Sequence, residues 1–163
     1  GLTTPRSVHV VGSNGKGSTA AIIAAGLTAA GARAGLFVSP HVEDFCERVS
    51  VDGEPISRRD VVRLLAGWRG LTLPLEPAFF EWTFALALSH FAARGVATAV
   101  VEAGIGAARD ATLALENVAL AVLTSVSLEH QSVLGPTLEA IARDKAAAVR
   151  PGVPLVTGVS GVA

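Results

Sequence analysis

The most constraining feature of the sequence is a glycine-rich turn between an apolar run and an alanine-rich stretch. Residues 8–12 read Val-His-Val-Val-Gly, Lys16 lies in the turn, and Ser18 and Thr19 open the alanine-rich stretch. A strand, a glycine-rich turn and a helix in this order direct backbone N–H groups and a helix N-terminus at an anion, which the lysine neutralises. The sequence therefore predicts a nucleoside triphosphate bound by one loop, made of Gly12, Ser13, Asn14, Gly15, Lys16, Gly17, Ser18 and Thr19.

Composition limits the possible partners and the location of the chain. Half of the 163 residues are hydrophobic, yet the longest apolar run, residues 20–27, is far shorter than the ~20 residues of a membrane span. A formal charge of −1 provides no basic surface for nucleic acid, and the single cysteine, Cys46, suits a reducing compartment. We expect no membrane or nucleic-acid partner and a cytoplasmic location.

The chain is long enough for one domain with a hydrophobic core, over residues 1–163. It begins with Gly and contains no Met, and its mean hydropathy of +0.51 is high. We expect it to be part of a longer polypeptide whose other domains cover the excess apolar surface.

Apolar runs of strand length alternate with helical patterns along the chain. Strands are expected at residues 7–11, 36–38, 96–101, 119–124 and 154–157, and helices at 18–30, 57–68, 78–94 and 138–149. Residues 40–56 are expected to be irregular or to form a hairpin that turns at Asp52-Gly53, and prolines break the chain between residues 74 and 77. This alternation predicts an α/β fold, a doubly wound and mostly parallel sheet that carries the phosphate-binding loop (a P-loop).

Three polar residues follow strands of the predicted sheet, at the edge where ligands bind in such folds. Glu102 ends one strand and could hold Mg²⁺ beside the phosphates, or could merely cap the next turn. Ser39 follows the second strand, where a serine before proline is also a common turn. His130 lies six residues beyond Thr124, and its imidazole suits transition metals better than magnesium.

Lys145 falls on the apolar stripe of the last predicted helix, with Leu138, Ile141, Ala142 and Val149. A lysine in this position must extend its amine to solvent, pair with an acid, or lose its charge. In the last case the neutral amine could capture CO₂ as a carbamate, an anionic group that could bind a metal.

The loop departs from the usual pattern G-x-x-x-x-G-K-[ST], because Val10 stands in place of the first glycine and Gly17 follows Lys16. In this departure it resembles the loop of the folylpolyglutamate synthase and dihydrofolate synthase family, within the Mur-ligase-like superfamily. The resemblance extends along the chain, through segments 36–41, 45–49, 53–57, 79–81, 101–106, 110–112, 128–130, 134–135 and 137–145. It implies the fold of the ATP-binding central domain of Mur ligases, without the N-terminal segment and the C-terminal glutamate-binding domain.

The resemblance also implies site residues. By it, Ser39 and Glu102 bind the magnesium of MgATP, His130 binds a second Mg²⁺, and Lys145 is carboxylated and also a metal ligand. Lys16, His130 and Lys145 would be catalytic. Contacts to the pterin substrate are implied for Phe80, Glu81, Asp110 and Ala111.

The chain departs from the family pattern at several positions. Segment 106–109 is Gly-Ala-Ala-Arg where the family has Gly-Gly-Arg-Leu, Glu129 replaces an aspartate, and Ser125 replaces an asparagine. The shifted arginine puts the pterin contacts in question more than the nucleotide site.

The expected function is that of an ATP-dependent ligase. It would join L-glutamate to a folate or dihydropteroate carboxylate through an acyl phosphate, and the isolated 163 residues would be inactive. Two alternatives stay open: a ligase of cell-wall precursors, against which segment 45–57 argues, and a non-catalytic ATP-binding module, which the altered segment 107–109 supports.

Overall fold

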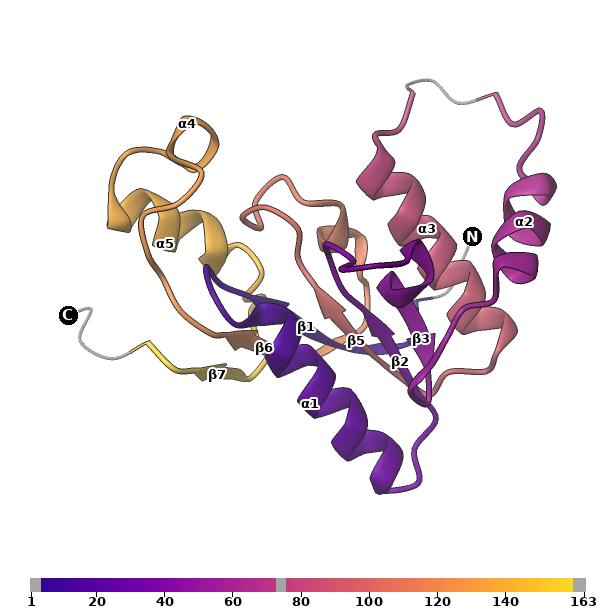
Figure 1. Ribbon diagram of the computed structural model, residues 1–163. Helices are drawn as coiled ribbons and strands as arrows, with labels where there is room; N and C mark the ends of the chain where they lie inside the picture. Colours follow the sequence, from indigo (N-terminus) through magenta and orange to yellow (C-terminus); the bar gives the residue numbers. More distant parts are fainter. Residues whose placement is uncertain (1–3, 73–75, 160–163) are drawn as a thin grey trace.

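The computed structural model describes residues 4–72 and 76–159 of the chain. These residues form one seven-stranded sheet with helices on both faces (Figure 1). The strands are β1 (Arg6–Val11), β2 (Ala34–Phe37), β3 (Val49–Val51), β4 (Glu54–Pro55), β5 (Thr98–Glu102), β6 (Val118–Leu123) and β7 (Leu155–Thr157). The helices are α1 (Lys16–Ala29), α2 (Arg58–Gly67), α3 (Phe79–Ala93), α4 (Gln131–Leu134) and α5 (Leu138–Ala146), with two short 3₁₀ turns, η1 (Phe45–Arg48) and η2 (Ala111–Ala114).

The strand order is β4-β3-β2-β5-β1-β6-β7, with β1 near the middle of the sheet. Strands β2, β5, β1, β6 and β7 run parallel, and β3 and β4 add an antiparallel edge. The predicted fold class, a doubly wound and mostly parallel sheet, is confirmed. Since parallel strands end at the same edge, the loops that follow β1, β2, β5 and β6 gather there.

The two faces of the sheet bury different helices, as the alternation of side chains along a strand requires. On β5, Val100 packs with Ala20 and Ala24 of α1, whereas Val101 packs with Phe91 of α3. Figure 1 shows α1 on one side of the sheet, with α3 and α5 on the other. Strand β5 is therefore covered by helices on both faces.

The ends of several elements differ from the sequence-based prediction by a few residues. Helix α1 starts at Lys16, two residues early, because the loop is tight enough for the helix to begin at the lysine itself. Helix α5 ends at Ala146 instead of residue 149. The expected hairpin exists as β3 and β4, with Asp52 and Gly53 both at positive φ, and the expected helix cap exists where Ser57 accepts from Asp60 N at 3.0 Å. Part of the proline-containing segment 74–77 lies outside the described residues.

The sequence reasoning missed α4 and both 3₁₀ turns, which are too short to show a period. None of the helices that the structure describes is long and apolar enough to cross a membrane.

Candidate nucleotide and substrate site

The loop after β1 has the backbone of a phosphate-binding loop. Gly12 has a φ of 146° and Gly15 a φ of 79°, both conformations that favour glycine. A Cβ on Gly12 would lie 2.0 Å from the hydroxyl oxygen of Thr124, so this glycine is also required by space. Helix α1 then starts at Lys16 with no acidic residue in its first turn, which leaves its positive end free for an anion.

The loop is held from the side by the segment that follows β6. The carbonyl oxygen of Ser125 accepts a hydrogen bond from Ser13 N at 2.8 Å, and the hydroxyl oxygen of Ser125 accepts one from Asn14 N at 2.9 Å. The Thr124 hydroxyl donates to Asn14 O at 2.8 Å. Ser125, which departs from the family pattern, therefore still supports the loop. Sequence reasoning did not assign this role, since nothing in a single chain links residues 110 positions apart.

Lys16 is partly exposed, and its Nζ donates to the carbonyl oxygen of Ser13 at 3.3 Å. The amine thus lies over its own loop, at the N-terminus of α1. In this position it can offset the negative charge of a phosphate group.

One cavity of about 640 Å³ brings the loop together with the residues predicted to contact substrate. It is lined by Ser13, Lys16, Ser39, Pro40, Arg48, Ala78, Phe80, Glu81, Gly104, Ile105, Arg109, Asp110, Ala111, Glu129, His130 and Val133. Four predicted nucleotide or metal residues (Ser13, Lys16, Ser39, His130) and all four predicted substrate residues therefore face one space. Their individual roles stay predictions.

Glu102 is not among the residues that line this cavity; it is only 4% exposed and lies behind Ser39, which does line it. Its Oε2 accepts the backbone N–H of Ser39 at 2.8 Å, and a Cβ on Gly17 would lie 3.3 Å from the same oxygen. Burial raises the pKa of the Glu102 carboxyl, although the Ser39 hydrogen bond and the charges of Lys16 and Arg48 act in the opposite direction. The ends of β2 and β5 and the start of α1 thus converge on one buried carboxyl.

The residues around Glu102 fit a magnesium ion that accompanies a nucleotide. Oε2 is taken by the Ser39 amide, whereas no described residue donates to Oε1. Within residues 4–72 and 76–159, no three His, Cys, Asp or Glu side chains gather as they would in a site made of protein ligands alone. Mg²⁺ that is bound together with a nucleotide is held by one or two protein oxygens, phosphate oxygens and water, which suits Glu102 and Ser39.

The cavity is also lined by two arginines that were not predicted as site residues from the sequence. Arg48 is 7% exposed, its Nε donates to His41 Nδ1 at 2.7 Å, and its guanidinium lies 5.3 Å from the centre of the Phe79 ring. Arg109 is exposed at the other side of the cavity. Both could bind an anionic substrate.

His130 is exposed, lines the cavity and adopts a left-handed backbone conformation, with φ 42°, just before α4. Lys145 is not among the lining residues. It is 1% exposed, and its Nζ donates to Glu129 Oε1 at 2.6 Å and to Gly12 O at 3.0 Å. Of the alternatives open for this lysine, the structure contains the pair with an acid.

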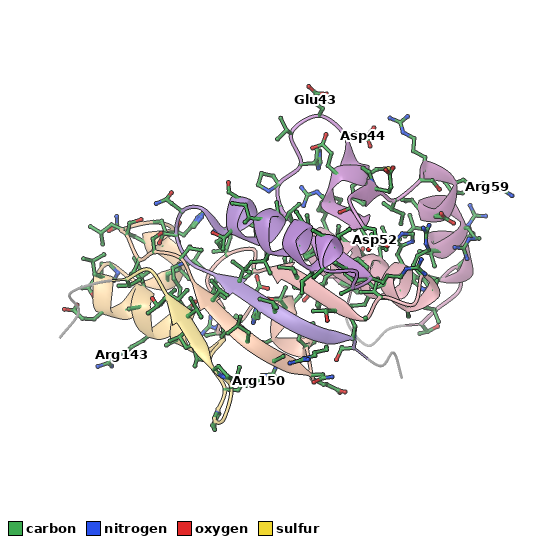
Figure 2. All side chains as sticks on the ribbon, turned by 90° about the horizontal axis from the view of Figure 1, so that it is seen from below. Glu43, Asp44, Asp52, Arg59, Arg143 and Arg150 are labelled. Atoms are coloured by element: carbon green, nitrogen blue, oxygen red, sulfur yellow. The ribbon has the colours of Figure 1, made fainter. Side chains whose placement is uncertain are left out.

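Arg143, two residues before Lys145 on α5, is exposed and not buried. Figure 2 shows Arg143 pointing away from the body of the molecule, whereas Lys145 is buried under the phosphate-binding loop. The predicted apolar stripe is therefore correct at Ile141 and Lys145, although Leu138 is 50% exposed.

A carboxylated Lys145 does not fit this arrangement as it stands. The carbamate would be an anion against the Glu129 carboxylate and the Gly12 carbonyl oxygen, which the ammonium now binds. Burial acts to raise the pKa of Glu129, but hydrogen bonds from Lys145 and Ser13 and the charges of Lys145 and Lys16 hold that pKa below its ordinary value. A metal-binding role for Lys145 would require this pair to open.

The altered segment 106–109 is well supported in the structure. Asp144 Oδ1 accepts the backbone N–H of Ala107 at 2.7 Å, and Gly106 has a φ of 66° with so little space that a Cβ would lie 2.2 Å from the same oxygen. The departure from the family pattern therefore leaves an ordered loop, with Arg109 shifted to its present position at the cavity.

Comparison with known proteins finds relatives that match almost the whole chain. The chain matches none of the established protein-family models. It is 47% identical over 161 residues to the Haloferax volcanii protein named "Probable bifunctional folylpolyglutamate synthase/dihydropteroate synthase", and 41% identical over 160 residues to the folylpolyglutamate synthase of Lacticaseibacillus casei. The matches cover 96% and 94% of this chain, but only 19% and 37% of those relatives.

Solved structures show the same relationship. The folylpolyglutamate synthase of Thermotoga maritima superposes with a TM-score of 0.87 at 33% identity, over 94% of this chain and 36% of that one. Escherichia coli FolC in complex with DHPP and ADP superposes with a TM-score of 0.84 at 31% identity, over 96% of this chain and 37% of that one. In sequence and in fold, the chain belongs to the folylpolyglutamate synthase and dihydrofolate synthase family and corresponds to little more than a third of its solved members.

Proposed function

We propose that the polypeptide carrying these residues is an ATP-dependent ligase that joins L-glutamate to a carboxylate of a folate or dihydropteroate. The observation that carries this proposal is the shared cavity, where Lys16 of the phosphate-binding loop and Asp110 of the expected substrate wall face one space. Support comes also from a solved folylpolyglutamate synthase that is 38% identical to this chain and is described as an AMPPCP–folate complex. A shared space is what phosphoryl transfer from ATP to a second substrate needs.

In the proposed reaction, an oxygen of the substrate carboxylate attacks the γ-phosphorus of ATP, and ADP leaves. The amine of L-glutamate then attacks the acyl carbon of the resulting acyl phosphate, the amide bond forms, and inorganic phosphate leaves with loss of a proton from the amine. Lys16 and the N–H groups at the start of α1 would stabilise the charge that develops on the transferring phosphoryl group. Mg²⁺ held by Glu102 and Ser39 would offset negative charge on the phosphates.

Several finer points belong to the same proposal. The family resemblance implies two Mg²⁺ ions, the second bound through His130, and a carboxylated Lys145. The carboxylated Lys145 requires the Lys145–Glu129 pair to open. A glutamate-binding domain elsewhere in the polypeptide, an ATP-binding domain over residues 1–163 and a cytoplasmic location are proposed on the same ground.

The proposal is tested by phosphate release from ATP, measured with the complete polypeptide that carries these residues. We expect release to require both L-glutamate and a pteroate or folate, with a product heavier by one glutamate residue. Release that requires a nucleotide-linked peptide instead would support a cell-wall ligase. ATP binding without phosphate release, under all substrate combinations, would support a non-catalytic module.

A further inference from the structure

His9 is a buried polar residue in the middle of β1 that none of the proposed steps uses. It is 1% exposed and does not line the cavity. Its Nε2 lies 2.8 Å from the hydroxyl oxygen of Thr112 in η2, on the face of the sheet opposite to α1. This contact joins two residues that are 103 positions apart in the sequence, and it connects β1 to η2.

The directions of the hydrogen bonds around Thr112 follow from its neighbour Asp110. The Asp110 carboxylate accepts the Thr112 hydroxyl at 2.5 Å and the Thr112 backbone N–H at 2.9 Å on Oδ1, and the N–H groups of Gly104 and Ile105 at 2.9 and 3.3 Å on Oδ2. Four donors suit an ionised carboxylate, which only accepts. The single proton of the Thr112 hydroxyl therefore points to Asp110, and its oxygen accepts from His9.

His9 must then carry its proton on Nε2. Burial and the charge of Arg150, only partly opposed by the charge of Asp110, lower the pKa of His9 from 6.5 to about 4. The imidazole is thus neutral near pH 7, with one N–H, and that N–H is used for Thr112. The three side chains form a one-way relay, from His9 to Thr112 to Asp110.

The last member of this relay shapes the wall of the cavity. A Cβ on Gly104 would lie 3.0 Å from both Asp110 Oδ2 and Phe80 Cζ, so the carboxylate, the glycine and the aromatic ring are in close contact. Asp110 holds the backbone of residues 104 and 105 with its second oxygen. Five cavity residues lie on this loop: Gly104, Ile105, Arg109, Asp110 and Ala111.

We propose that His9 is a positioning residue for the carboxylate-bearing substrate: through Thr112 it fixes Asp110, and with it the loop of residues 103–111 that forms one wall of the cavity. The identity of the substrate in this inference rests on the proposed function, whereas the ordering of the loop by His9 does not. The relay ends on the substrate side, so its loss affects that side more than the phosphate-binding loop.

The test compares Thr112→Val, which removes the hydroxyl and keeps the shape, with Thr112→Ser, which keeps the hydroxyl. In the complete polypeptide we expect Thr112→Val to raise KM for the pteroate or folate about tenfold, as loss of a hydrogen bond to a charged group would. KM for ATP should change less than twofold, and Thr112→Ser should stay near wild type. His9→Leu and His9→Gln form a second pair, since only glutamine retains an N–H donor.

Hydrogen exchange gives a readout that does not depend on the substrate. We expect the amides of Gly104 and Ile105 to lose protection about tenfold in Thr112→Val, whereas Ala107, whose N–H is bound by Asp144, keeps its protection. Unchanged protection together with unchanged KM for the pteroate would overturn the proposal, as would equal rises in both KM values. If the wild-type polypeptide uses no pteroate or folate, the proposed function fails, and the exchange result alone decides on the relay.

Discussion

The amine of Lys145 lies 2.6 Å from Oε1 of Glu129, in a pair of which the lysine is 1% and the glutamate 21% exposed. The same amine binds the Gly12 carbonyl oxygen, so the pair ties α5 to the start of the phosphate-binding loop. In this arrangement both contacts engage the amine that would have to react with CO₂.

Glu129→Gln is expected to make Lys145 reactive towards CO₂, because the anion that binds the ammonium is removed. The measurement is the carbamate signal in ¹³C NMR spectra recorded in labelled bicarbonate. Glu139→Gln, on the exposed face of α5, changes the net charge equally and is expected to show no signal, like the ligand-free wild type. An equally strong signal in the ligand-free wild type would mean that the pair does not protect the amine.

Lys16→Ala is expected to reduce phosphate release from ATP at least about a hundredfold, because the loop then lacks the cation that offsets the phosphoryl charge. Steady-state phosphate release in the complete polypeptide measures this. Arg33→Ala is the matched control, since Arg33 is also a cation but lies outside the cavity, beside Asp52. Normal turnover in Lys16→Ala would remove this lysine from the proposed site.

Gly12→Ala is expected to lower the free energy of unfolding by at least about 2 kcal/mol, because its Cβ would collide with Thr124 and its φ of 146° disfavours a side chain. Denaturant unfolding measures the change. Gly26→Ala, in α1 with nothing within 4 Å of its Cβ, should instead stabilise by about 0.5–1 kcal/mol. Equal effects of the two changes would contradict the packing described for Gly12.

Glu102→Gln is expected to raise the magnesium concentration that nucleotide turnover requires, because a neutral amide binds the ion more weakly than a carboxylate, without lowering the free energy of unfolding at pH 7. The amide retains the size of the carboxyl and can still accept the Ser39 N–H, while the cost of a buried charge disappears. Burial raises the pKa of Glu102, so its carboxylate takes up a proton at a higher pH than an ordinary glutamate does. As the pH is lowered, magnesium binding in the wild type should therefore begin to weaken at a higher pH than it would at a glutamate with an ordinary pKa. Turnover of Glu102→Gln with unchanged magnesium dependence would show that the ion is held elsewhere.

His9 is expected to make the fold less stable in mild acid. Its pKa is lowered from 6.5 to about 4, so between these values the unfolded chain binds a proton that the folded chain does not. The stability is fully present above pH 6.5 and falls as the pH falls towards 4, by up to about 3 kcal/mol. Because His9→Gln cannot titrate at this position, the wild type should lose stability relative to His9→Gln as the pH falls from 6.5 towards 4. A stability difference that stays constant across this window would show that folding does not lower the pKa of His9.

Much of the site followed from chain order alone. Gly12, Lys16 and Glu102 were predictable because a strand that ends in glycine, or in an acid after an apolar run, fixes their position at one edge of a parallel sheet. The period of α5 placed Ile141 and Lys145 on one stripe, but it left open whether the Lys145 amine extends to solvent, pairs with an acid or loses its charge.

The partners of these residues could not be predicted from the sequence. The acid that Lys145 meets, Glu129, and the serine that supports Asn14, Ser125, lie on the segment after β6, whose path depends on tertiary packing. Arg48 was missed because its burial depends on His41 and Phe79, from two different elements. Short-range pattern carries no information on contacts of this kind.

The central position of β1 has a mechanical consequence. Its carboxyl end leads into the loop that holds Lys16, and one side chain inside it, His9, reaches the loop of Asp110 through Thr112. Because β1 is bonded to a neighbour on each side, a slip by one residue would turn His9 to the opposite face and displace Gly12 together. The nucleotide and substrate halves of the cavity therefore both depend on the register of this one strand.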